Sequence, residues 1–174
     1  MHIPHAFYAF GASFAIGAAA VPPWQVIALS TYSPSGRPNS SPDYYISATI
    51  QNPDPSKGDD ASDIEVDCKA TWQYPNLPYN KMFDCVLSGG TDSSWSWSME
   101  PIQANSTSAS STTNFVLQFQ AMSSTGPSGE STGWAGTQSF AVGDNLQGTC
   151  AGSGFCSWAL KADKIPVLVD AHEI

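Results

Sequence analysis

Apolar and polar residues alternate along short stretches of this chain, and the clearest stretch is DIEVDCKATW at residues 63–72. In an extended strand its alternate apolar residues would share one face. These residues are Ile64, Val66, Cys68, Ala70 and Trp72. Period-two alternation of this kind is typical of a half-buried β-strand, and here it places a cysteine on the buried side.

Comparable stretches recur between clusters of Gly, Pro, Ser and Asn. They cover residues 24–32, 44–51, 81–88, 93–100, 114–122, 134–143, 154–162 and 165–171. Short alternating runs with frequent turn signals indicate an all-β domain. The sequence therefore predicts a single-domain antiparallel β-barrel or sandwich of about eight strands.

The cysteine in the first stretch has a natural partner in the next one. If residues 63–72 and 81–88 form a hairpin, one register places the in-phase apolar residues of both stretches on the same side. That register pairs Val66 with Leu87, Cys68 with Cys85, and Ala70 with Phe83. Opposed residues at a non-hydrogen-bonded position lie about 4.5 Å apart at Cα, within reach of a disulfide.

The first twenty residues differ from the rest, because they contain no acidic residue, Lys or Arg. Residues 6–16 form an apolar core of signal-peptide length, and Ala18, Ala19 and Ala20 fit a small-residue cleavage site. We predict a signal peptide at 1–20 and a secreted domain at 21–174. The alternative is a buried N-terminal helix.

Secretion changes the interpretation of the four cysteines, because an even number in an oxidising compartment indicates disulfides. The second pair, Cys150 with Cys156, would close a short loop that contains Gly152 and Gly154. Zinc is the competing interpretation, but neither spacing is C-x-x-C. Reduced cysteines in a cytosolic protein are the remaining alternative.

The balance of charge limits the classes of partner. The chain has 15 acidic and 6 basic residues, a formal net charge of −9. Repulsion between like charges argues against nucleic acid or an anionic membrane as a partner.

Few residues could carry catalysis. After residue 20 there is one histidine, His172, and one arginine, Arg37, and no G-x-S-x-G or H-E-x-x-H motif. Glu100 and Asp170, at strand ends, are the only carboxylate pair that we would nominate for a glycosidase. We therefore expect no enzyme activity, no cofactor and no metal. The alternative is a secreted cell-wall carbohydrate-binding module or an acid glycoside hydrolase.

Two further features concern the surface. Trp95 and Trp97 alternate with serines, so they form either a binding surface, for example for sugar rings, or part of the core. Asn39 and Asn105 each begin an N-glycosylation sequon in a loop-like context.

The order of these features resembles the family of small secreted fungal proteins typified by the Alternaria major allergen, which includes plant-defence elicitors. The matching segments are WQVI, YYISATIQ, DIEVDC, FDC, WSWSM, NFVLQFQ and the late cysteine pair, spread over most of residues 24–170. The resemblance implies a single β-barrel with two intrachain disulfides. The four cysteines are the only residues whose role it transfers.

The same resemblance implies a non-enzymatic effector, elicitor or allergen-like role. The expected partner is an extracellular protein of a plant host or a small ligand. Some members of the family have an extra cysteine that links two chains. This chain has no such cysteine, so we expect a monomer or a non-covalent dimer.

Overall fold

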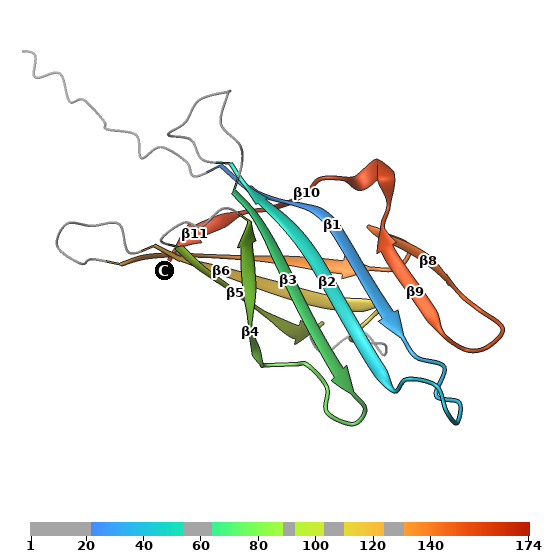
Figure 1. The fold of residues 1–174 in the computed structure, drawn as a ribbon. Helices are drawn as coiled ribbons and strands as arrows, with labels where there is room; N and C mark the ends of the chain where they lie inside the picture. Colours follow the sequence, from blue (N-terminus) through green and yellow to red (C-terminus); the bar gives the residue numbers. More distant parts are fainter. Residues whose placement is uncertain (1–21, 54–63, 89–92, 103–109, 124–130) are drawn as a thin grey trace, which may run out of the picture.

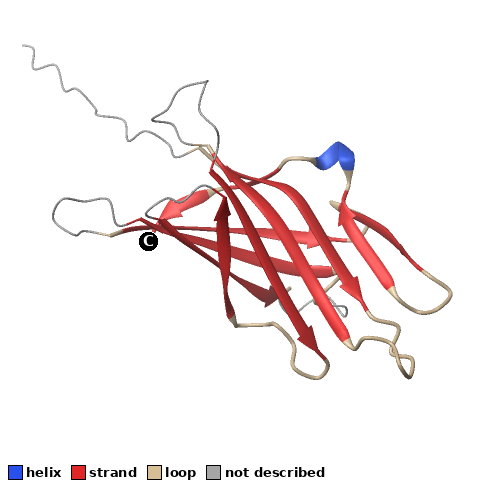
Figure 2. Ribbon diagram, viewed as in Figure 1, coloured by secondary structure: helices blue, strands red, loops and turns tan. Residues whose placement is uncertain are grey.

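The computed structural model describes residues 22–53, 64–88, 93–102, 110–123 and 131–174. Within these ranges the chain forms eleven β-strands and one short 3-10 turn (Figure 1, Figure 2). The fold is all-β and antiparallel, as the alternating pattern predicts. The signal peptide predicted at 1–20 lies outside the described residues.

The strands follow the alternating stretches closely. Their bounds are β1 Trp24–Ser33, β2 Asp43–Asn52, β3 Ile64–Gln73, β4 Met82–Ser88, β5 Ser93–Pro101, β6 Asn114–Ser123, β7 Thr132–Ala141, β8 Leu146–Cys150, β9 Cys156–Leu160, β10 Val167–Val169 and β11 Ala171–Glu173. The turn η1, Ala162–Lys164, lies between β9 and β10.

The expected count of about eight strands is too low for the part of the chain that the structure describes. β8 was missed because LQGTC has no apolar alternation, and only Leu146 in it is buried. The last apolar stretch divides into β10 and β11, which pair with different strands.

The strands form one curled sheet in the order β11-β7-β6-β5-β4-β3-β2-β1-β9-β8, and β10 pairs with β1. In Figure 1, β1, β2 and β3 run side by side in front, and β5, β6 and β7 lie behind them. The sheet is therefore a half-barrel whose two layers face each other.

The C-terminal segment connects the two ends of this curl. β10 pairs with the start of β1, from Trp24 to Val26, and β11 pairs with β7 from Trp134 to Gly136. A Cβ atom on Gly136 would lie 2.7 Å from Val169 Cγ1 and 2.9 Å from the carbonyl oxygen of Asp170. Glycine at this position therefore permits the close approach of the C-terminal segment to β7.

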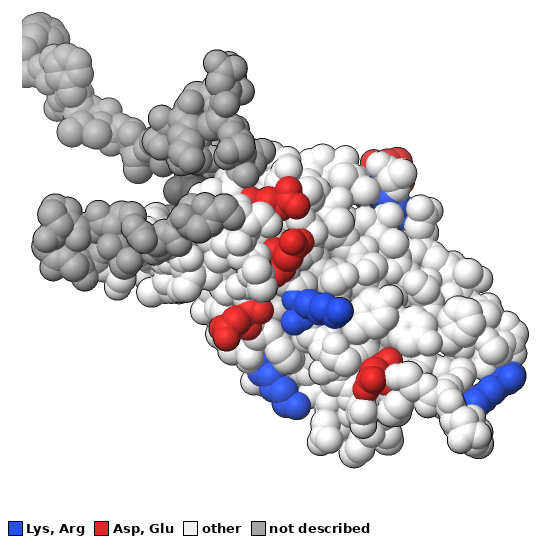
Figure 3. Space-filling view, in the orientation of Figure 1, with Lys and Arg blue, Asp and Glu red and all other residues white. Residues whose placement is uncertain are grey.

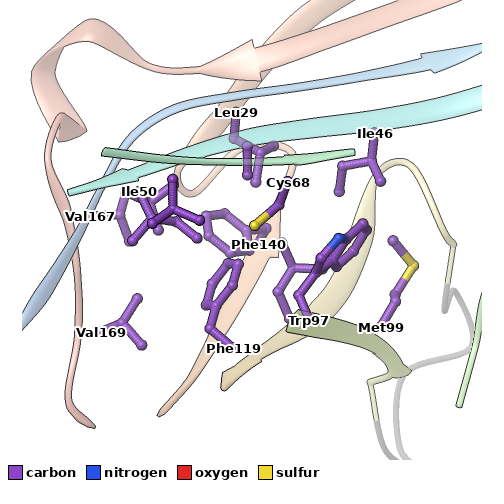
Figure 4. Close-up of a cluster of buried hydrophobic side chains, with 14 of the residues drawn as sticks. Leu29, Ile46, Ile50, Cys68, Trp97, Met99, Phe119, Phe140, Val167 and Val169 are labelled. Carbon is purple, nitrogen blue, oxygen red and sulfur yellow. The ribbon is translucent and has the colours of Figure 1, made fainter. Parts of the chain in front are cut away.

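The core fills the space between the two layers. Its largest fully buried side chains include Trp97, Phe115, Phe119, Phe140, Ile46 and Ile50. Figure 4 shows Cys68 from β3 among side chains of both layers. Each large apolar side chain that is fully buried contributes about 1.5–3 kcal/mol to folding, so this cluster is the main source of stability.

The register predicted for the β3–β4 hairpin is confirmed in its first half. Val66 pairs with Leu87 and Cys68 pairs with Cys85, where the ladder ends. The predicted continuation to Ala70 and Phe83 is not part of it, because the beginning of β4 pairs with β5 instead. β4 thus changes partner halfway and joins the front layer to the back layer.

Candidate functional site

Both predicted disulfides are present. The Cys68–Cys85 bridge joins β3 to β4, with 4.3 Å between the two Cα atoms, and the Cys150–Cys156 bridge joins β8 to β9, with 4.0 Å. Cys68 is buried and belongs to the core, whereas Cys150 is exposed. Two disulfides in a small all-β domain fit an extracellular protein.

The β8–β9 loop, which the second disulfide closes, contacts the neighbouring β1–β2 connection. The Arg37 guanidinium, in the β1–β2 connection, donates a hydrogen bond of 3.1 Å to the carbonyl oxygen of Gly152. Gly154 has a φ of +96°, and a Cβ atom there would lie 3.3 Å from the carbonyl oxygen of Ser35. The β1–β2 and β8–β9 connections therefore pack against each other at one end of the half-barrel.

Three aromatic rings stack on the outer face beside these connections. Tyr32 of β1 lies opposite Tyr45 of β2, with ring centroids 5.3 Å apart and planes 11° apart. Phe155, in the β8–β9 loop, stacks on Tyr32 at 6.1 Å and remains 41% exposed. We call Phe155, Tyr32 and Tyr45 the aromatic stack.

A groove of about 300 Å³ lies on the same outer face, next to the aromatic stack. It is lined by side chains of β1, β2 and β9 and by Ile165, which follows η1. The residues that the groove presents include Ala28, Ser30, Ser47, Thr49, Ala159 and Ile165. We call this feature the outer groove.

A β-bulge in β1 helps to shape the outer groove. The β1–β2 register shifts between Val26 and Ala28, so Ile27 is an extra residue. Before the bulge Trp24 and Val26 face the core, and after it Leu29 and Thr31 do so. Ile27 and Ala28 are therefore both available to line the groove, a common use of bulges near binding sites.

The outer groove lies on an uncharged part of the surface. β1 and β9 contain no charged residue, and β2 contains only Asp43, at its first position. β3 instead carries Glu65, Asp67 and Lys69. In Figure 3 the area over β1 and β9 is white, whereas red and blue side chains gather over β3 and β4.

Asp43 lies at the edge of this uncharged area. Its carboxylate accepts hydrogen bonds from the Gln73 amide at 2.7 Å and from the Ser41 hydroxyl at 2.9 Å. These bonds favour the ionised form, so they lower the pKa of Asp43 below its usual value, the Gln73 bond contributing most.

The binding surface suggested for Trp95 and Trp97 is wrong. The two side chains are 3% and 1% exposed and belong to the core, where Trp95 packs on Trp24 and Trp97 packs on Phe83. The core interpretation is confirmed, because both tryptophans are buried, whereas Ser94 is exposed and Ser96 is half-buried.

The structure does not bring the nominated carboxylates together. Glu100 of β5 pairs with Val116 of β6, and Val116 pairs in turn with Ser139 of β7. Asp170 precedes Ala171, which pairs with Gly136 of β7. In the sheet order, β6 and β7 lie between β5, which carries Glu100, and β11, which follows Asp170, so the two acids are not on neighbouring strands. His172 is exposed on β11, away from both connections that hold the aromatic stack.

Of the two sequons, Asn39 is described and Asn105 lies outside the described residues. Asn39 is exposed in the β1–β2 connection and has a φ of +66°. It is thus accessible and lies two residues from Arg37.

Two other features, a metal site and a membrane-spanning helix, are not present among the residues that the structure describes. These residues contain no group of three or more His, Cys, Asp or Glu side chains arranged to hold a metal ion. They also contain no helix with the length and apolar character needed to cross a membrane.

The aromatic stack and the outer groove were missed by the sequence analysis. A signal existed, because pairing β1 with β2 across their turn would have placed Tyr32 opposite Tyr45. Phe155 and Ile165 had no such signal, because both lie in connections between strands, where alternation does not assign a face.

No family model, no curated protein and no solved structure matches this chain.

Proposed function

We propose that this protein is a secreted effector or elicitor that acts without catalysis. It binds an extracellular protein of a plant host, or a small ligand, through a preformed surface. This role is the one that the resemblance to the Alternaria allergen family implies.

The observation that carries the proposal is an uncharged and partly aromatic face on a strongly acidic protein. Aromatic residues are enriched in protein interfaces, and charged residues are depleted in interface cores. The aromatic stack and the outer groove have this composition. The hydrogen bond from Arg37 to Gly152 and the Cys150–Cys156 disulfide hold that face in place before any partner binds.

A preformed surface lowers the entropic cost of binding, because fewer side chains and loops must be ordered in the complex. A face without charge also suits a partner whose contact region is neutral. The acidic residues of β3 and β4 would repel acidic partners that approached from that side.

Leaf infiltration tests the proposal. Oxidised protein at micromolar concentration should induce an oxidative burst or cell death within the infiltrated area. The control is the same protein after reduction, alkylation and heating, which has the same sequence without the folded surface. No response to the oxidised protein, or an equal response to the unfolded control, would contradict the proposal.

A pull-down from apoplastic fluid sharpens the result. Oxidised protein should retain a host component that the unfolded control does not retain. Phe155→Ala should reduce that retention, because Phe155 is the most exposed ring of the aromatic stack.

A further inference from the structure

The outer groove has a polar floor and apolar sides. Ser30 and Ser47 lie opposite each other on β1 and β2, and their hydroxyl oxygens are 2.8 Å apart. Thr49 donates its hydroxyl proton to Asp67 at 2.8 Å. Ala28, Ala159 and Ile165 supply apolar surface around these hydroxyls.

The hydroxyls of the floor retain hydrogen-bonding capacity. A serine hydroxyl offers one donor and two acceptor lone pairs. The bond between Ser30 and Ser47 uses one donor and one lone pair, which leaves one donor and three lone pairs between the two groups. A ligand with its own hydroxyl groups can use both kinds.

The aromatic stack adjoins this floor directly. Tyr32 follows Ser30 by two residues and Tyr45 precedes Ser47 by two, so all four side chains share the outer face. Tyr32 stacks with both Tyr45 and Phe155, and the partly exposed Phe155 provides apolar surface at the end of the stack.

The outer groove is open to solvent because it lies on the exterior of a sheet. An apolar ligand would keep one side in water and so lose part of the gain from burial. A saccharide fits this situation better, because its C–H groups pack on apolar and aromatic side chains while its outer hydroxyls stay hydrated.

The lining also determines the charge of the ligand. None of the residues that line the outer groove is charged. The nearest charge identified by a bond is the carboxylate of Asp67, which holds the Thr49 hydroxyl. Across the β2–β3 ladder Thr49 pairs with Asp67 and Ser47 pairs with Lys69, so the two neighbouring charges have opposite signs. The net charge of −9 on the whole protein therefore decides against an anionic sugar.

We propose that the outer groove and the aromatic stack form a binding site for a neutral oligosaccharide. Ser30 and Ser47 hydrogen-bond sugar hydroxyls, Phe155 packs against a sugar ring, and Ala159 keeps the floor low enough for the ligand to enter. This proposal rests on the proposed function, because it uses the same face and names a class of ligand that the face would take.

The test is a titration of the purified, oxidised protein with sugars, in which binding is monitored by NMR or calorimetry. The probes are hexamers of β-1,3-glucan, chitin and xylan, with an oligogalacturonate as the anionic comparison. At least one neutral hexamer should bind saturably at concentrations up to about 10 mM, a range that covers weak affinities. The oligogalacturonate should bind at least tenfold more weakly.

Two substitutions locate the site. Ala159→Lys fills the floor of the outer groove and should weaken binding at least tenfold. Val86→Lys is its matched control, because it introduces the same side chain at a position on β4 that is 71% exposed and outside the groove. It should leave the affinity unchanged. Phe155→Ala should weaken binding about threefold to tenfold, the range expected for one aromatic contact.

The result would overturn the proposal if no neutral hexamer bound, if Ala159→Lys bound as well as the parent, or if the oligogalacturonate bound more tightly. Circular dichroism of each variant checks that the fold is retained. Because the titration uses purified sugars, its failure leaves the leaf response unaffected. A missing leaf response likewise leaves the sugar titration unaffected.

Discussion

The β3–β4 and β8–β9 hairpins each carry one disulfide between directly paired strands, yet the two bridges serve different parts of the molecule. Cys68–Cys85 lies between strands whose inner faces belong to the core, at the point where β4 leaves β3 for β5. Cys150–Cys156 lies at the base of an exposed loop that carries Phe155.

The two hairpins differ in how much else holds them. β3 is paired with β2 along its whole length, and its residues Val66, Cys68, Ala70 and Trp72 are buried in the main cluster. β8 pairs only with β9 among the described strands and buries only Leu146. The first bridge therefore reinforces a region that packing already stabilises, whereas the second maintains a surface loop that has little packing of its own.

This difference assigns one disulfide mainly to the stability of the fold and the other mainly to the shape of the candidate site. Substitutions at each hairpin can separate the two roles, because global unfolding and local opening are measured by different experiments.

The largest effect is expected for the double substitution Cys68→Ala and Cys85→Ala. The bridge spans a sequence separation of 17 residues, and loop entropy alone predicts a loss of about 3 kcal/mol in the free energy of unfolding. Urea denaturation of the parent and the variant measures this loss. A change no larger than that of the second disulfide would contradict a main role of this bridge in global stability.

The double substitution Cys150→Ala and Cys156→Ala should have a smaller global effect. With a sequence separation of 6 residues, the same relation predicts about 2 kcal/mol. Hydrogen exchange should nevertheless accelerate selectively in β8, β9 and their loop. If exchange accelerated equally in β2 and β3, the local role of this bridge would be wrong.

The part of this comparison that could be predicted is the part set by side-chain alternation. Cys68 lies in phase with Ile64, Val66 and Ala70, and the in-phase position on the next stretch is Cys85, so strand, register and bridge followed together. The buried phase of Trp95 and Trp97 could be assigned in the same way, although a surface role had remained open.

The remainder depends on contacts between distant segments, which alternation along one strand does not encode. The change of partner in β4, the pairing of β10 with β1 and the position of Ile165 over the outer groove all require the complete curl of the sheet. Gly148 is a local example. A Cβ atom there would overlap the backbone of Ser157, yet nothing in LQGTC marks the residue as part of a strand.

Arg37→Ala should have a still smaller effect on stability, because the guanidinium is exposed and makes a single hydrogen bond to Gly152. We expect a loss of about 0.5 kcal/mol. Exchange at the β8–β9 loop should accelerate as it does without the second disulfide, but less. Lys164→Ala, at another exposed cation, is the control and should change neither quantity. Unchanged exchange in Arg37→Ala would show that the two connections are not coupled.

The smallest effect is a dependence of stability on pH that we expect from the β3–β4 hairpin. Tyr79 lies in the β3–β4 connection and packs against the core. Burial disfavours the phenolate, so it raises the pKa of Tyr79 above the usual value of 10.0. Since the folded state then binds this proton more tightly than the unfolded state, the contribution is fully present below about pH 10 and is lost as pH rises through the folded pKa.

Tyr79→Phe should remove this contribution, so the variant should lose less stability than the parent between about pH 9 and pH 11. The measurement is urea denaturation across that range. Tyr74→Phe is the matched control, because Tyr74 lies in the same connection and is 77% exposed. The Tyr74 variant should lose as much stability as the parent over this pH range. Equal behaviour of the two variants would mean that burial of Tyr79 does not link the first hairpin to pH.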